Sequence, residues 1–414
     1  MAHRARSFVD ASHFVWKVAI LLLAWSSWAP AAYQTIINNG PNDNRVNMVF
    51  LGDGYTAPQL STLYPTHINS MLSHFFNEGE DPYPRYKNFF NVHRIDLVSN
   101  ESGADVPPLN IFRNTALDST YYFDGSTDRL LYVNEGKANT ALNNGLAGSG
   151  FTADVKMVTV NDSRYGGGGG TYAVYAGGNS SATEIALHEN GHSFNKLADE
   201  YGGPGTYTAA EPVELNVTKN STGAKWSQWL GYNDPKTGLV GAYQGGRYFD
   251  AGIYRPSSNS KMRSLGRPFD PIAREKIILD IYAIIDPLDG WLSNTLPLNN
   301  PPELWVDTID PAIIKLQWSV NGTLVPGASG ERFSLNSYGP GAYTITARAY
   351  DPTGFDAVNG WVRRNQNTLE QSISWAVVLV PEPTCVGMVV IFLGLGMRRR
   401  PDQGSSSSRT VSSW

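Results

Sequence analysis

The chain has almost no cysteine. The single cysteine among its 414 residues is Cys385, close to the C-terminus, so the rest of the chain can form no internal disulfide. We therefore expect the folded body to depend on its apolar core. Basic residues are also scarce: 32 Lys and Arg against 37 Asp and Glu give a formal net charge of −5, and no basic tract lies in the central part. Nucleic acid is therefore excluded as a partner, because phosphate binding requires a basic face.

Long apolar runs are absent as well, and the two short ones lie near the ends. At the start, Arg4, Arg6 and Lys17 come before the apolar "VAILLLAW" and the small-residue "APAA". This order is typical of a secretory signal, here cut after Ala31. The run is shorter than the roughly 20 residues of an ordinary membrane span. The sequence therefore predicts that residues 1–31 are a signal peptide and that the protein is exported.

The second short run lies in "VPEPTCVGMVVIFLGLGMRRR", residues 380–400. A Pro-Glu-Pro stop, an apolar stretch and an arginine cluster follow one another, which resembles the PEP-CTERM sorting tail of Gram-negative bacteria. The resemblance implies transient membrane anchoring by residues 380–414 and removal by an exosortase. The protein would then reside in the cell envelope, on the cell surface or outside the cell. A weak membrane anchor is the alternative.

The body contains no repeat of fixed period and divides into three regions. In the first, residues 33–145, strand-like runs at 47–51 and 89–98 flank a segment with helical spacing, which predicts a small α/β domain. A glycine turn at 52–54 follows the first strand, but the lysine of a phosphate-binding loop is missing. The residues at helical spacing are Ile68, Met71, Leu72, Phe75 and Phe76.

The second region, residues 146–292, combines a β-branched strand candidate at 155–162, the glycine-rich 165–178 and two helices. We expect the strand to be able to pair with an extended substrate. The glycines would let another backbone approach closely, or form a mobile rim. In the second helix Asp270 can act as the cap, with Pro271 in the first position.

The third region, residues 300–379, follows the linker-like 294–303 and changes to a period of two. Alternation around Trp318 leads into the hairpin turn Asn321-Gly322. Several short strands of this kind predict an immunoglobulin-like β-sandwich. The whole chain is therefore expected to be α+β, with a zincin-like domain between the α/β domain and the sandwich.

The stretch "LHENGHSFNKLADEY", residues 187–201, carries the chemistry. Ser181 and Glu184 have the spacing of a capping box and predict a helix start. His188 and His192 are four residues apart, so their rings share one helix face and can bind one ion. Glu189 can reach a metal-bound water. This H-E-x-x-H arrangement predicts a single catalytic Zn²⁺ with a glutamate as general base.

A third zinc ligand must be a carboxylate if it follows the helix, because no histidine lies beyond His192. Asp199 is the nearest candidate, Glu200 is next, and Glu275 could come from the later helix. Asn195 can adopt the left-handed conformation that would turn the chain back. The residues alone leave these three ligands open.

"HENGHSFNKLADEY" resembles the signature of the IgA peptidase family of zinc metallopeptidases, which is grouped with the metzincins. "VFLGDGYT" (49–56), "VNDSRYGGGGG" (160–170) and "YRPSSNSKMRSLGRPFDPIAREKI" (254–277) carry the resemblance across roughly 45–290. It implies that His188, His192 and Asp199 bind zinc and that Glu189 is the base. It also implies that Met262 forms the methionine turn beneath the metal. Lys196 departs from the family, whose members often have glycine there.

The resemblance implies an endopeptidase acting on proteins or peptides. From the parts of the site, we expect the oxyanion to rest on zinc and on a phenol or guanidinium. Tyr201, Tyr254 and Arg263 are candidates, and the sequence does not choose among them. The alternative is a non-catalytic surface or adhesion protein with a structural zinc. The intact Glu189 argues against it, because a structural site needs no base. A zinc hydrolase of non-peptide amides would share the same site.

Overall fold

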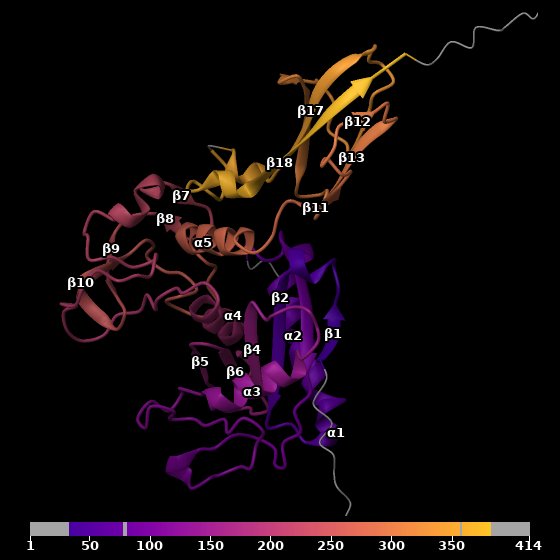
Figure 1. The fold of residues 1–414 in the computed structure, drawn as a ribbon. Coiled ribbons are helices and arrows are strands. Elements are labelled where there is room, and N and C mark those ends of the chain that lie inside the picture. Colours follow the sequence, from indigo (N-terminus) through magenta and orange to yellow (C-terminus); the bar gives the residue numbers. More distant parts are fainter. Residues whose placement is uncertain (1–32, 78–80, 357, 382–414) are drawn as a thin grey trace, which may run out of the picture.

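The computed structural model describes residues 33–77, 81–356 and 358–381 (Figure 1). The expected signal peptide lies outside the described residues, and so does the sorting tail apart from its first two positions. In the part of the chain that is described, no helix combines the length and apolar character needed to cross a bilayer.

A six-stranded sheet forms the centre of the body, in the order β1-β3-β2-β4-β6-β5. Strands β3, β2, β4 and β6 run parallel, and the edge strands β1 and β5 run antiparallel to their neighbours. The strands expected at 47–51, 89–98 and 155–162 are confirmed. The bounds are β1 Tyr33–Ile37, β2 Val46–Asp53, β3 Phe90–Ile95, β4 Val155–Val160, β5 Gly167–Gly169 and β6 Ala173–Ala176.

Both faces of this sheet are covered, which explains why β2 is buried along its whole length. Met48 and Phe50 belong to a core shared with α2 and α4, whereas Val49 and Leu51 face α3 and the long connection 96–134. The expected apolar face of α2 is buried as predicted. The helices are α1 Ala57–Leu60, α2 Leu63–Asn77, α3 Glu135–Gly145 and α4 Ala182–Ser193, with short 3-10 turns at Asn42–Asn44, Lys87–Phe89 and Pro107–Leu109.

The expected domain boundary between residues 145 and 146 falls inside this sheet. β2 pairs with β4 along its length, from Met48 opposite Val155 to Asp53 opposite Val160. Residues 33–145 therefore share one core with the helix that carries HENGH, and they do not form a separate sheet. Parallel strands are joined through long crossovers, so local sequence gives little sign of which strands pair.

Residues 200–260 form a lobe of short strands beside the sheet, at the left of Figure 1. It is followed by α5 (Pro271–Tyr282), whose expected cap is confirmed: Asp270 accepts hydrogen bonds from the backbone N–H groups of Ile272 and Ala273, both at 3.0 Å. The lobe contains β7 Asn233–Asp234, β8 Gly238–Leu239, β9 Tyr243–Gly246, β10 Phe249–Arg255 and a 3-10 segment at Ala224–Trp229.

Residues 288–379 form two sheets with the orders β11-β13-β16 and β12-β18-β17-β14-β15. Trp318 stacks on Phe333 from the other sheet, with 5.0 Å between ring centroids, so the two sheets face each other. This unit begins at β11, before the expected linker 294–303, and its immunoglobulin-like topology stays a prediction. The bounds are β11 Leu288–Trp291, β12 Leu298–Asn299, β13 Glu303–Thr308, β14 Lys315–Val320, β15 Thr323–Leu324, β16 Arg332–Ser334, β17 Gly341–Tyr350 and β18 Glu370–Leu379, with 3-10 turns at Pro352–Gly354 and Gln366–Leu369.

The two-sheet unit packs directly on the rest of the protein. One apolar cluster extends from β2 through α5 to β18. The fully buried Asp351, just after β17, accepts hydrogen bonds from the hydroxyls of Tyr86 at 2.7 Å and Tyr282 at 3.0 Å. It also pairs with Arg85 at 2.7 Å. The segment between β17 and β18 is therefore fixed to α5 by a continuous core and a polar cluster.

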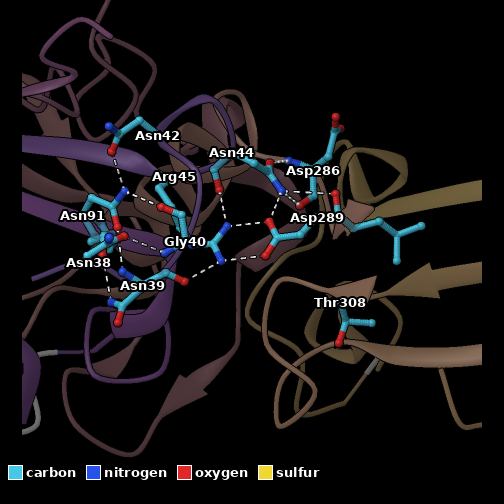
Figure 2. Close-up of polar contacts among 12 residues, drawn as sticks. Asn38, Asn39, Gly40, Asn42, Asn44, Arg45, Asn91, Asp286, Asp289 and Thr308 are labelled. Carbon is cyan, nitrogen blue, oxygen red and sulfur yellow. Dashed lines mark hydrogen bonds and ion pairs between the residues drawn. The ribbon is translucent and has the colours of Figure 1, made fainter. Parts of the chain in front are cut away.

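A second connection joins the start of β2 to the start of β11 (Figure 2). The buried Arg45 donates to both carboxylate oxygens of Asp289, at 2.6 and 2.7 Å, and to the carbonyl of Asn39 at 2.7 Å. Asn44 adds a hydrogen bond to Asp289 at 2.8 Å and accepts one from the backbone of Asp286 at 2.7 Å. This ion pair clamps the two-sheet unit onto the central sheet.

Candidate active site

Helix α4 carries the HENGH motif and packs against β4, β5 and β6. The capping box expected from Ser181 and Glu184 is not formed, because Ser181 makes no side-chain cap bond. Glu184 instead pairs with His74 at 2.9 Å and with Lys261, and accepts from the backbone N–H of Gly266 at 2.6 Å. Its carboxylate thereby ties the first turn of α4 to the segment around residues 261–266.

His188 and His192 project from one face of α4 and meet Asp199. The two Nε2 atoms are 3.1 Å apart, and Oδ1 of Asp199 lies 3.1 Å from the first and 3.2 Å from the second. Tetrahedral zinc with bonds of about 2.05 Å separates neighbouring ligand atoms by roughly 3.3 Å. The three atoms therefore fit one zinc ion. His188, Glu189 and His192 also form a metal-sized group, within 4.8 Å, but the triangle with Asp199 is tighter.

Both imidazoles are oriented by backbone carbonyls. Nδ1 of His188 lies 3.0 Å from the carbonyl oxygen of Lys261, and Nδ1 of His192 lies 2.7 Å from that of Leu197. A carbonyl can only accept, so each Nδ1 carries a proton, and each Nε2 faces Asp199. Such outer partners fix the tautomer and ring orientation of metal-binding histidines.

The turn that brings Asp199 back is made at Lys196, not at Asn195 as expected. Lys196 has φ +53°, and its ammonium donates to the carbonyl of Ser193 at 2.6 Å. Asn195 is held instead by its buried side chain, which accepts from Tyr83 at 3.1 Å and donates to Asp280 at 2.9 Å. The left-handed conformation is therefore found at Lys196, one position after the expected Asn195 and at the position where the resembled family often has glycine.

Asp199 is only 7% exposed, and its second oxygen accepts a hydrogen bond from the hydroxyl of Tyr248. Burial raises the pKa of Asp199, but hydrogen bonds from His188 and His192 overcome it and hold that pKa well below its ordinary value. Burial lowers the pKa of His192, but Asp199 outweighs it and raises that pKa to about 9. Sequence reasoning missed Tyr248, because nothing local links it to a residue 49 positions away.

Glu189 lies under the glycine-rich strand β5. A Cβ at Gly167 would stand 2.4 Å from Ile185 and 3.0 Å from Oε1 of Glu189, and one at Gly169 would stand 2.4 Å from Cβ of His192. The expected close approach of the glycine backbone is therefore confirmed. Burial raises the pKa of Glu189, and the charges of the two histidines and, more weakly, of Arg129 oppose that shift.

The expectation that the strand at 155–162 can pair with substrate is wrong. β4 lies between β2 and β6, so both of its edges are already hydrogen bonded. The edge strand is β5. There the N–H of Gly167 donates to the carbonyl of Arg129 at 3.1 Å and its carbonyl accepts from Leu131 at 3.2 Å, so this position is also occupied.

Met262 lies directly beneath the motif. It is fully buried, and a Cβ at Gly191 would stand 2.8 Å from its sulfur. Its carbonyl accepts from the backbone N–H of Glu200 at 2.8 Å, while the preceding carbonyl, from Lys261, holds His188. The turn at 261–264 therefore contributes both an apolar floor and one orienting contact.

The remaining ligand candidates lie elsewhere. The carboxylate of Glu200 is fully buried and accepts from Asn216 at 2.9 Å and Ser260 at 2.6 Å, so it is directed away from the histidines. Burial raises its pKa. Glu275 is also buried, and it accepts from the indole of Trp229 at 2.9 Å and from the backbone of the segment after Trp361.

A cavity of about 210 Å³ opens beside Glu189 and His188. Of the three oxyanion candidates, Tyr201 and Arg263 line it, whereas Tyr254 is paired with Thr218 through the backbone and does not. The sequence did not single out Arg129 or Tyr165, which also line it. The full lining is Arg129, Tyr165, Gly167, Ile185, His188, Glu189, Tyr201, Arg263, Ser264 and Leu265.

A helix with two histidines and a half-buried glutamate, closed by an aspartate after the turn, is typical of mononuclear metallopeptidases. Residues 35–238 match the family model described as IgA Peptidase M64. The match supports the resemblance noted above and, with it, a peptidase. It contains the whole HENGHSFNKLADEY stretch and ends before Tyr248, Met262 and Arg263. No curated protein matches the chain.

Proposed function

We propose that this protein is an exported zinc-dependent endopeptidase of proteins or peptides. The observation that carries the proposal is the triangle of His188 Nε2, His192 Nε2 and Asp199 Oδ1, with Glu189 beside it in the cavity. These three residues would hold one Zn²⁺. Export, residence at a Gram-negative cell envelope or surface, transient membrane anchoring and exosortase processing are part of the proposal and rest on the terminal segments alone.

When bound, zinc supplies Lewis acidity that activates a water and polarises the scissile carbonyl. Glu189 takes the proton of the attacking water and delivers it to the leaving amine. The raised pKa of Glu189 suits this role, because a carboxylate with a raised pKa returns a proton more readily near neutral pH. The carbonyls of Lys261 and Leu197 hold the two imidazoles, and Tyr248 holds Asp199.

The test is hydrolysis of a mixed peptide pool, with zinc content measured on the same samples. Glu189→Ala should lose at least about a hundredfold in kcat/KM, the size of a lost general base, and keep one zinc. Glu303→Ala, an exposed position on the two-sheet unit, should leave both unchanged.

Two other outcomes would replace the proposal. A wild-type protein that cuts no peptide, together with a Glu189→Ala variant that loses its zinc, would make Glu189 a ligand of a structural zinc in a surface or adhesion protein. Cleavage of small non-peptide amides without any cleavage of peptides would identify a different zinc hydrolase.

A further inference from the structure

Two arginines from separate segments line the cavity beside Glu189. Arg129 lies near the end of the 96–134 connection, where its carbonyl bonds to β5, and its guanidinium carbon is 5.7 Å from the ring centroid of Tyr201. Arg263 directly follows Met262, and its backbone N–H donates to Ser260 at 3.0 Å. Both positions are therefore fixed through the backbone to elements that build the catalytic site.

Neither arginine has a carboxylate partner. Among the described residues, no carboxylate forms an ion pair with Arg129 or Arg263, whereas Arg247, in the lobe of residues 200–260, pairs with Glu214 at 3.2 Å. The guanidinium of Arg263 donates to the carbonyl of Ser258 at 2.5 Å, a neutral acceptor. Glu189 is the only acidic residue in the cavity lining, and the proposed reaction uses it as the base. Two guanidinium groups thus face one carboxylate in the lining, which leaves one positive charge in excess among the lining residues.

The cavity is small and has non-polar walls as well as charge. Its volume of about 210 Å³ is below the roughly 300–1,000 Å³ of pockets that enclose whole drug-sized ligands. It suits a single amino-acid side chain or a chain end. Tyr165, Tyr201 and Leu265 provide the walls. Guanidinium groups bind carboxylates through paired charge-assisted hydrogen bonds, which strengthen when water is partly excluded.

We propose that Arg129 and Arg263 bind a carboxylate of the peptide substrate next to the scissile bond, which makes the enzyme selective for an acidic group there. The carboxylate comes either from an aspartate or glutamate side chain or from the C-terminus of the peptide. This inference rests on the proposed peptidase function, and it assigns to Arg263 a role in substrate binding in place of a role at the oxyanion.

The experiment uses the full zinc-loaded protein and peptides that share one sequence around a mapped cut site. The residues on either side of the cut are changed in turn to Glu, Gln or Lys, and each peptide is made with a free and an amidated C-terminus. At one position Glu should exceed Gln in kcat/KM by about ten- to a hundredfold, the size of a charge-assisted hydrogen bond.

The variants Arg129→Met and Arg263→Met should each reduce the Glu-to-Gln ratio towards one while cleavage of the Gln peptide continues. Arg267→Met, an exposed arginine of the neighbouring turn, should keep the wild-type ratio. A preference that requires a free C-terminus one residue from the cut identifies the chain end as the source and makes the enzyme a carboxypeptidase in place of an endopeptidase. A preference that survives amidation identifies the side chain. A wild-type ratio near one, or a ratio that neither variant changes, overturns the inference.

If the zinc-loaded protein cuts no peptide, the proposed function fails and the pocket is judged by binding alone. Calorimetry with an acetylated, amidated Glu peptide and its Gln counterpart should then show tighter binding of the Glu peptide, lost in Arg129→Met. Equal binding of the two peptides overturns the carboxylate pocket as well.

Discussion

Asp199 links the two histidines to Tyr248, because its two carboxylate oxygens have different neighbours. Oδ1 faces both histidines, and Oδ2 accepts the hydroxyl of Tyr248. Tyr248 makes this contact although the residue is 57% exposed and its backbone has φ +70°. A non-glycine residue in that region costs on the order of 1–3 kcal/mol and persists where the surroundings enforce it. We infer that the contact to Asp199 is the function of this turn.

Tyr248→Phe tests that inference at the scale of one hydroxyl. Removing the donor leaves the ring in place and releases one oxygen of Asp199, so zinc affinity should fall about ten- to a hundredfold, as for other outer-shell partners. Competition with a chelator measures the affinity. Tyr254→Phe removes the hydroxyl of a residue that does not line the cavity, so this variant should keep the wild-type zinc affinity. Equal zinc affinities in the two variants would show that the hydroxyl of Tyr248 does not contribute to zinc binding.

At the scale of elements, the end of α4 depends on one left-handed residue. Lys196→Ala and Lys196→Gly both lose the ammonium bond to Ser193, so they differ only in backbone preference. At φ +53° the glycine variant should be more stable by about 1 kcal/mol, as measured by denaturant unfolding.

The matched pair is Thr140→Ala and Thr140→Gly inside α3, where both lose one side-chain bond to Gly136. There the order should reverse, with alanine more stable by about 1 kcal/mol. The same order at both positions would contradict a left-handed Lys196.

Glu184 couples α4 to the segment at residues 261–266 in a manner that depends on pH. Burial raises the pKa of Glu184, but bonds from His74 and Lys261 outweigh it and bring that pKa from the ordinary 4.5 to about 2. Because the folded value is the lower one, this contribution is complete above about pH 4.5 and is lost as pH falls towards 2. It amounts to at most about 3 kcal/mol of unfolding free energy, because the carboxylate is partly exposed and solvent screens its contacts. Glu184→Gln should therefore lose less stability than wild type between pH 5 and 2 in denaturant titrations.

The matched control is Glu303→Gln, at an exposed ion pair. In this variant the free energy of unfolding should depend on pH as it does in wild type. If the free energy of unfolding depends on pH in the same way in wild type and Glu184→Gln, the contacts of Glu184 with His74 and Lys261 contribute nothing to stability.

The elements differ in how far sequence could predict them. Helices α2 and α5 were predictable because apolar spacing and the Asp270 cap are local signals. The HENGH residues were predictable for the same reason, since four-residue spacing fixes one face. The pairing of β2 with β4, and the contacts of Arg129 and Tyr248 with the site, join segments far apart in the chain. Such contacts are set by tertiary packing and leave no local pattern.

At the scale of the whole molecule, the Arg45–Asp289 pair joins the two units that the sequence separates. Arg45→Met would leave Asp289 largely buried without its partner and should lower the free energy of unfolding by about 3–5 kcal/mol. Calorimetry should show one cooperative transition at a lower temperature, because the apolar core is continuous. Arg332→Met breaks an exposed pair with Glu303 and should cost less than about 1 kcal/mol. Two separate transitions, only one of them shifted, would indicate independently folding units.

The position of β18 has a consequence for the time at which the protein can fold. This last described strand lies between β12 and β17, and its residues Ile373, Trp375 and Val377 belong to the same core as α5 and β2. Chains are made from the N-terminus, and early segments fold first only when their packing partners already exist. The core is therefore incomplete until residue 379 has been made. The motif helix is synthesised long before then, so acquisition of the finished catalytic body is a late event in the life of each chain.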